Sequence, residues 1–174
     1  MLAAVGSILF AVEEIISLPI PFFKLGLANV VTLMVLIAYG FREAIAVVVL
    51  RVLVGSLLIG TLFQPNFLFS LSGGVASALV MGFLIRWGRG WFGLVGISIL
   101  GALAKNTAQL LMAYALWVKQ MKILSLLPLF FLVSIGAGTV VGLLTWSLMK
   151  KIRFPGARTG DFPYRVGRPA HSMD

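Results

Sequence analysis

The run Phe92–Val118 reads FGLVGISILGALAKNTAQLLMAYALWV and contains a single charged residue, Lys105. A helix of about 20 apolar residues crosses the roughly 30 Å hydrocarbon core of a bilayer. The whole chain has the same character, because 60% of its 174 residues are hydrophobic and only 11% are charged. Its mean hydropathy is +1.08, and a soluble domain of this length cannot bury so much apolar surface. The sequence therefore predicts an all-α integral membrane protein.

Outward from this run, the chain divides into apolar runs of helical length, separated by short interruptions that contain Pro, Gly or charged residues. The runs are Leu2–Leu18, Leu25–Gly40, Arg42–Leu62, Phe67–Trp87, Phe92–Val118 and Ile123–Met149. Because the connections are short, we expect successive helices to be antiparallel neighbours. The prediction is a compact bundle of six transmembrane helices in residues 1–151, followed by a basic, flexible cytoplasmic tail in residues 152–174.

The distribution of Lys and Arg predicts the orientation, because positively charged loops are retained in the cytoplasm. With the N-terminus inside, the cytoplasmic side receives Arg42, Arg86, Arg89, Lys150, Lys151 and Arg153. The outer side receives only Lys24, Lys119 and Lys122. We therefore expect both termini in the cytoplasm and the tail against anionic lipid headgroups, with docking of a partner protein as the alternative. Because residues 1–10 carry no basic residue, we expect no secretory signal peptide.

Composition and motifs exclude several classes of function. The net charge is +9, but residues 150–174 contribute +4 of it, with six basic and two acidic residues. The remaining charges form no basic stripe, which argues against a nucleic-acid partner. The chain has no Cys, its one His and both Asp lie in the tail (His171, Asp161 and Asp174), and it lacks a P-loop. We therefore expect no metal, no cofactor and no catalysis by this chain alone.

Some ionisable residues fall inside the predicted spans, where each costs roughly 3 kcal/mol on insertion scales. They are Glu13, Glu14, Arg51 and Lys105. The two glutamates are adjacent, hence about 100° apart around a helix, and cannot face the same point. Two acids and two bases at overlapping depth suggest ion pairing. Purely structural pairing, without any ligand, is the alternative.

The run Phe92–Val118 also carries a polar and small-residue stripe at helical spacing, formed by Ser98, Ala102, Lys105, Asn106, Gln109 and Ala113. In the predicted orientation Lys105, Asn106 and Gln109 share the outer half of the membrane with Glu13, Glu14, Asn29, Ser70 and Ser72. This convergence predicts a cavity that opens to the outside and is lined by apolar and hydrogen-bonding groups. Scattered hydrogen bonds between helices are the alternative.

Small residues repeat every four positions in the first and last predicted helices. The rows are Ala3, Ser7 and Ala11, and Ser134, Gly138 and Gly142. Such rows let helices approach closely, because nothing protrudes between the backbones. Packing inside the bundle is one interpretation, and reception of a helix from a partner protein is the other.

A set of short motifs spans the first five predicted helices: Lys24–Asn29, Gly40–Ala44, Arg51–Thr61, Ser70–Gly74, and Gly101–Asn106 with Gln109. In these motifs the chain resembles a family of small bacterial membrane proteins known as the Gx transporter family, also labelled heptaprenyl diphosphate synthase component I. That family is similar to the S components of energy-coupling factor transporters. The resemblance implies a multi-pass protein of the bacterial cytoplasmic (inner) membrane that captures a vitamin-like compound from outside.

The resemblance also implies partners: a transmembrane coupling protein, received by the row Ala3, Ser7 and Ala11, and ATPase subunits that supply the energy. In this hypothesis one glutamate balances Lys105, and nearby amides orient the ligand. The predicted substrate-binding residues are Glu13, Glu14, Lys24, Asn29, Arg51, Ser70, Ser72, Lys105, Asn106 and Gln109.

Two alternatives stay open at this point. The family label suggests a non-catalytic membrane subunit of heptaprenyl diphosphate or isoprenoid-quinone synthesis, in which Lys24, Arg51 and Lys105 pair with an allylic diphosphate. Since the spans lack clustered aspartates, another chain would then have to hold the Mg²⁺. The other alternative is a structural assembly factor that binds no small molecule.

Overall fold

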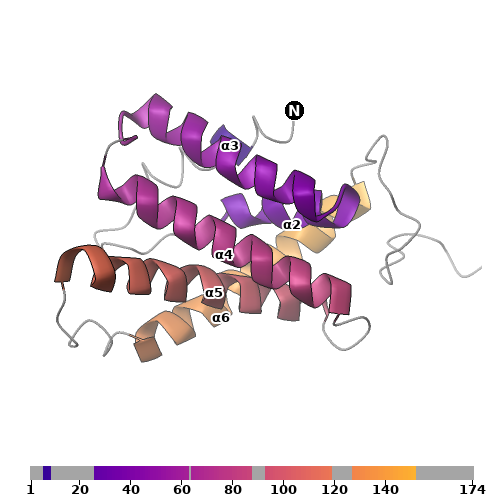
Figure 1. Ribbon diagram of the computed structural model, residues 1–174. Coiled ribbons are helices and arrows are strands. Elements are labelled where there is room, and N and C mark those ends of the chain that lie inside the picture. Colours follow the sequence, from indigo (N-terminus) through magenta and orange to yellow (C-terminus); the bar gives the residue numbers. More distant parts are fainter. Residues whose placement is uncertain (1–5, 9–25, 63, 88–92, 119–126, 152–174) are drawn as a thin grey trace, which may run out of the picture.

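A computed structural model describes residues 6–8, 26–62, 64–87, 93–118 and 127–151 of the chain. Within these ranges all regular structure is helical (Figure 1). The elements are α2 (Ala28–Ala38), α3 (Phe41–Ile59), α4 (Pro65–Trp87), α5 (Leu94–Ala113) with a π-helical turn (Tyr114–Val118), and α6 (Leu127–Lys151). Residues 6–8 are helical as well. The all-α prediction is confirmed for the described residues.

The number of helices and the side of the termini stay predictions. Most of the run Leu2–Leu18 and the tail 152–174 lie outside the described residues. The helices α3 to α6 do run antiparallel to their neighbours in the sequence, as the short connections predict (Figure 1).

Glycine conformations explain where two helices differ from their predicted ends. The helix α2 starts at Ala28 rather than Leu25, because Gly26 has a φ of 78° and turns the chain just before it. The helix α3 ends at Ile59 rather than Leu62, because Gly60 has a φ of 76° and caps it. There the Thr61 N–H donates to the Ser56 carbonyl oxygen at 2.8 Å.

Three of the described helical segments are long and apolar enough to cross a membrane: Pro65–Trp87, Leu94–Leu116 and Leu127–Lys151. The helix α3 has 19 residues but carries Arg42, Glu43 and Arg51. The helix α2 has only 11 residues, which rise about 16 Å, half of the hydrocarbon core. These segments show a membrane protein, while the prediction of six full spans remains open.

The short helix α2 is buried at every position and packs against α3, α4 and α6. A helix that is mostly apolar and buried on all sides belongs in the interior of a bundle. Outward-facing side chains of the surrounding helices are apolar too, for example Leu57 and Leu58 of α3 and Leu132 of α6. This pattern is typical of a protein that faces lipid outside and protein inside.

The helix α5 packs most extensively against α4 and α6. Glycines make the α5–α6 contact possible: a Cβ at Gly138 would lie 2.5 Å from the Ile99 Cα, and one at Gly142 would lie 2.7 Å from the Val95 Cα. For the row Ser134, Gly138 and Gly142, packing inside the bundle is therefore confirmed.

Candidate functional site

Buried polar side chains join α2, α3 and α4. Arg51 of α3 is 3% exposed, and its Nη2 donates to the Asn29 Oδ1 of α2 at 3.2 Å. The Asn29 Nδ2 in turn donates to the Ser77 Oγ of α4 at 3.3 Å. Gly74 of α4 leaves room for this arrangement, since a Cβ there would lie 3.5 Å from the Arg51 Nη2. Asn29 thus has both ends of its amide engaged by neighbouring helices.

A second polar contact joins α5 and α6. The Asn106 Nδ2 donates to the Ser134 Oγ at 2.8 Å, and the Ser134 hydroxyl donates to the Phe130 carbonyl oxygen at 2.6 Å. Asn106 is 5% exposed and Ser134 is fully buried. This chain of hydrogen bonds fixes the Asn106 amide, so that its Oδ1 is the end left to accept a further bond.

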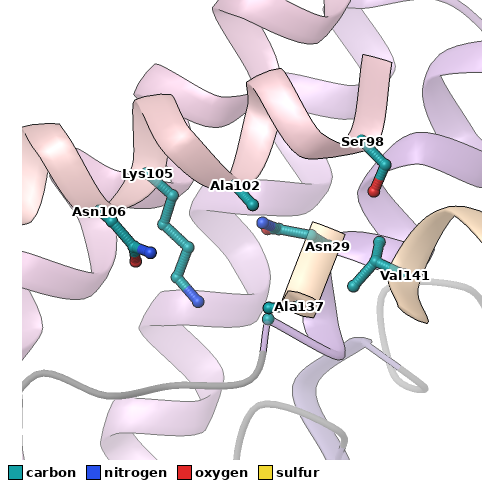
Figure 2. Close-up of a pocket in the computed structure, with 8 residues that line it drawn as sticks. Asn29, Ser98, Ala102, Lys105, Asn106, Ala137 and Val141 are labelled. Carbon is teal, nitrogen blue, oxygen red and sulfur yellow. The ribbon is translucent and has the colours of Figure 1, made fainter. Parts of the chain in front are cut away.

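Between these two contacts lies a pocket formed by α2, α5 and α6 (Figure 2). Its lining consists of Gly26, Asn29, Ser98, Ala102, Lys105, Asn106, Ala137 and Val141. The unfilled space is about 240 Å³ when its open side is counted. The enclosed part has room for about one water molecule. The pocket is therefore narrow, with polar groups on α2 and α5 and apolar ones on α6.

Nitrogen atoms converge where α2 begins. The Lys105 Nζ lies 3.6 Å, and the Asn29 Nδ2 lies 3.7 Å, from the position that a Cβ at Gly26 would take. The first turn of α2 is closed by the Asn29 N–H, which donates to the Gly26 carbonyl oxygen at 2.7 Å. The N-terminal end of a helix carries a partial positive charge. The Lys105 ammonium group lies beside this end of α2.

Acidic side chains are scarce in the part of the chain that the structure describes. Glu43 is the one carboxylate in the described ranges, and it is exposed at the start of α3. Glu13 and Glu14, the predicted counter-charges of Arg51 and Lys105, lie outside the described residues. The predicted ion pairing therefore remains a prediction.

The structure brings some of the predicted binding residues together and places others elsewhere. Asn29, Lys105 and Asn106 line the pocket, and Arg51 reaches it through Asn29. Gln109 is buried but lies against α4, where a Cβ at Gly73 would be 2.8 Å from its Cγ.

The remaining predicted binding residues do not line the described pocket. Ser70 of α4 is buried, and the Ser72 hydroxyl donates to the Phe69 carbonyl oxygen of its own helix at 3.2 Å. Lys24 lies outside the described residues, as the two glutamates do.

Of the row predicted to receive a partner, the structure describes only Ser7, which is buried at 4% exposure. Its neighbour Gly6 packs on α2 and α3, since a Cβ there would lie 3.5 Å from the Val31 Cγ1 and 3.7 Å from the Arg51 Cβ. This position favours packing inside the bundle for Ser7. Ala3 and Ala11 lie outside the described residues, so the row as a partner surface remains a prediction.

Sequence reasoning did not place three serines in the site. Ser77 accepts from Asn29, Ser134 accepts from Asn106, and Ser98 lines the pocket. Ser98 belongs to the polar stripe of α5, and Ser134 to the small-residue row of α6. Ser77 follows Ser70 by seven residues on the same face of a helix, which is the signal that could have identified it.

Comparison with families of known proteins gives a match over most of the chain. The model of the family described as heptaprenyl diphosphate synthase component I matches residues 2–148. The comparisons with curated proteins and with solved structures found no match. The matched range includes every residue of the pocket and the buried cations Arg51 and Lys105. The chain belongs to the heptaprenyl diphosphate synthase component I family.

Proposed function

We propose that this protein is the substrate-binding (S) component of an energy-coupling factor type uptake transporter, which captures a small vitamin-like or precursor molecule from the outer side. The observation that carries the proposal is the pocket, in which Lys105, Asn29 and Asn106 meet inside an apolar bundle. Ionisable groups inside a membrane are costly and mark binding sites or transport paths. Unwound or broken helices near the membrane centre commonly form such sites, and α2 begins beside Lys105.

The residues suggest how a ligand would be held. Lys105 supplies a positive charge, and the Asn106 Oδ1 accepts a hydrogen bond from the ligand while Ser134 holds the amide in place. Arg51 holds the Asn29 side chain in place by donating a hydrogen bond to its Oδ1. Drug-sized ligands occupy pockets of about 300–1,000 Å³, so the narrow pocket must widen between α2, α5 and α6 when a ligand binds.

The direction of access is part of the proposal. The start of α3 lies beside the end of α4, since a Cβ at Gly82 would contact the Phe41 ring. The end of α6 lies at the same end of the bundle (Figure 1). This end carries Arg42, Arg86, Lys150 and Lys151. The positive-inside rule then makes it cytoplasmic, and α2 begins toward the outside.

Cysteine labelling tests this orientation without background, because the chain has no Cys. Arg86→Cys in sealed right-side-out vesicles should react with a membrane-permeant maleimide but not with a charged, impermeant one. Equal labelling of Arg86→Cys by both reagents would show that this end of the bundle lies outside, opposite to the proposed orientation. Inverted vesicles, in which both reagents should react, are the control.

We further propose that the chain is not an enzyme by itself. A transmembrane coupling protein and ATPase subunits would supply the energy, and the bacterial cytoplasmic (inner) membrane would be its location. The apolar outer faces of α3 and α6 are available to lipid or to such a membrane partner. Of the predicted partner row Ala3, Ser7 and Ala11, Ser7 is buried in the bundle, so Ala3 and Ala11 stay the predicted positions for that partner.

The family name favours a second candidate function, that of a non-catalytic membrane subunit in heptaprenyl diphosphate synthesis. The supporting observation is that the buried cations Arg51 and Lys105 both flank Asn29. Together they could pair with an allylic diphosphate, and another chain would supply the Mg²⁺ sites. Transport is the better-supported candidate, because Lys105 is the one cation among the described residues that line the pocket, and a diphosphate carries more than one negative charge.

Purification from native membranes in mild detergent separates the candidates. Mass spectrometry should identify a coupling protein with ATPases and a retained small molecule. Lys105→Ala and Asn106→Ala should lose that molecule, whereas Ser72→Ala, which alters a hydroxyl bonded to its own helix, should retain it. Copurification of a soluble prenyltransferase would favour the second candidate, and absence of any small molecule would favour an assembly factor.

A further inference from the structure

One face of α6 points away from the bundle over almost the whole length of the helix. Leu132 on this face is 70% exposed, and Leu143 is 52% exposed. The residues that pack inside the bundle, Ser134, Gly138 and Gly142, lie on other sides of the same helix. The members of the exposed α6 face recur at helical spacing and none of them is buried: Leu132, Gly136, Thr139, Leu143, Trp146 and Lys150.

The middle of the exposed α6 face is suited to hydrocarbon. Its one hydroxyl, that of Thr139, donates to the Ile135 carbonyl oxygen of the same helix at 2.7 Å, so it needs no partner from outside. Counted from Lys150, Leu143 lies about 10 Å and Thr139 about 16 Å along the helix. One leaflet of a bilayer has a hydrocarbon depth of about 15 Å. An acyl chain that starts beside Lys150 therefore meets only apolar or satisfied groups.

The end of the exposed α6 face holds a cation in place. The Lys150 Nζ lies 3.4 Å from the centroid of the Trp146 ring, where the face of the ring attracts a positive charge. A free lysine side chain loses much rotational freedom when it binds a ligand, and this contact reduces that loss. The ammonium group has three N–H donors, and those that point away from the ring can donate to a phosphate oxygen.

A second tryptophan indicates that this end of the bundle lies at headgroup level. Trp87 at the end of α4 is 71% exposed, and its ring stands at 86° to the Phe83 ring with the centroids 4.2 Å apart. The ends of α4 and α6 lie together, because Ile85 and Met149 pack against the same hydrophobic core cluster. Exposed tryptophans are typical of the boundary between hydrocarbon and headgroups.

The charge at this end selects the kind of headgroup. The described residues there include the cations Arg42, Arg86, Lys150 and Lys151. Glu43 is the one carboxylate in the ranges that the structure describes, and it lies at the same end. An excess of basic residues at the membrane surface attracts anionic lipids over zwitterionic ones.

We propose that the exposed α6 face binds an anionic phospholipid, with the phosphate at Lys150, the glycerol region beside Trp146 and an acyl chain along Leu143 and Thr139. Trp146 acts here as a positioning residue, because it holds the ammonium group that the phosphate meets. This inference goes beyond the proposed function and holds whichever small molecule the pocket binds.

Fluorescence of Trp146 tests the inference at the site itself. The other three tryptophans are replaced by phenylalanine (Trp87, Trp91 and Trp117→Phe), and the whole protein is placed in phosphatidylcholine nanodiscs with a small share of brominated lipid, which quenches tryptophan on contact. Brominated phosphatidylglycerol, which is anionic, should quench Trp146 more strongly than brominated phosphatidylcholine. Lys150→Gln should lower this preference about fivefold, the share expected of one basic residue beside anionic lipid. Lys150→Arg, which keeps the charge, should retain the preference.

Arg86→Gln is the matched control, because it removes the same charge at the same end but lies on α4, outside the exposed α6 face. It should lower the preference much less than Lys150→Gln. Native mass spectrometry of the chain with all its tryptophans gives an independent measurement, in which Lys150→Gln should retain less phosphatidylglycerol than the natural sequence.

Either of two results would overturn the inference. Equal loss of preference in Arg86→Gln and Lys150→Gln, or no preference at all, would show that the lipid responds only to the general surface charge. No quenching of Trp146 by either brominated lipid would show that a second copy of the chain covers this face.

Discussion

Two neighbouring regions of the α5–α6 contact differ in how they fill space. At Gly138 and Gly142 the backbones of the helices touch, with no side chain between them. One residue earlier on α6, Ala137 and Val141 line the pocket instead. The same pair of helices therefore forms a close, apolar contact and a polar gap side by side. The close contact at Gly138 and Gly142 therefore sets the distance between α5 and α6, and with it the position of Ala137 and Val141 at the pocket.

The largest expected effect comes from breaking the glycine contact. In Gly138→Val the new side chain would collide with the Ile99 backbone, where even a Cβ lies 2.5 Å from the Cα. Backbone atoms cannot rotate away, so the free energy of unfolding should fall by about 3 kcal/mol, the upper end for overpacking. Unfolding by SDS in mixed micelles, followed by circular dichroism, would measure it.

Gly136→Ala is the control for that prediction, because it lies on the same helix and a Cβ there meets nothing within 4 Å. It should be neutral or stabilise by up to about 1 kcal/mol, as alanine favours helices over glycine. Equal destabilisation by both variants would show that α6 does not lie against α5 as described.

A smaller effect is expected on the polar side of the comparison. Asn29→Ala removes the acceptor of Arg51 and the donor to Ser77, leaving buried groups with fewer partners. The free energy of unfolding should fall by about 2 kcal/mol. Ser77→Ala removes only one of these bonds and should cost about 1 kcal/mol. If Ser77→Ala cost as much as Asn29→Ala, the Arg51 contact would contribute nothing.

The smallest effect concerns the bond between α5 and α6. A double-mutant cycle of Asn106→Ala and Ser134→Ala should give a coupling free energy of about 0.6 kcal/mol, the average for hydrogen bonds between membrane helices. The same SDS unfolding experiment measures it. A coupling of zero would mean that Asn106 does not hold Ser134 in the membrane, despite the 2.8 Å distance.

Much of the fold followed from the sequence, because hydropathy is a local property. Apolar runs with at most one charged residue each located α4, α5 and α6 within a few residues of their ends. The full burial of α2 could not be predicted in the same way, because the same apolar residues suit a helix surrounded by protein and a helix surrounded by lipid. Its start was set by the left-handed conformation of Gly26, which a glycine permits but does not dictate.

The candidate site was partly predictable for a similar reason. Lys105 and Asn106 stood out because polar residues are rare in a membrane helix, and they do line the pocket. Gln109 belongs to the same stripe, yet it faces Gly73 of α4, because a stripe spans more than one neighbouring helix. Which neighbour each residue meets depends on tertiary packing, and spacing within one helix does not contain that information.

The most direct test of the account is an experimental structure of the whole protein purified from native membranes with its small molecule retained. The account predicts density for that molecule between α2, α5 and α6, in contact with Lys105 and Asn106, with α2 displaced from α5 to make room. Density for the molecule at another place in the bundle, with the pocket still closed around Lys105, would contradict it.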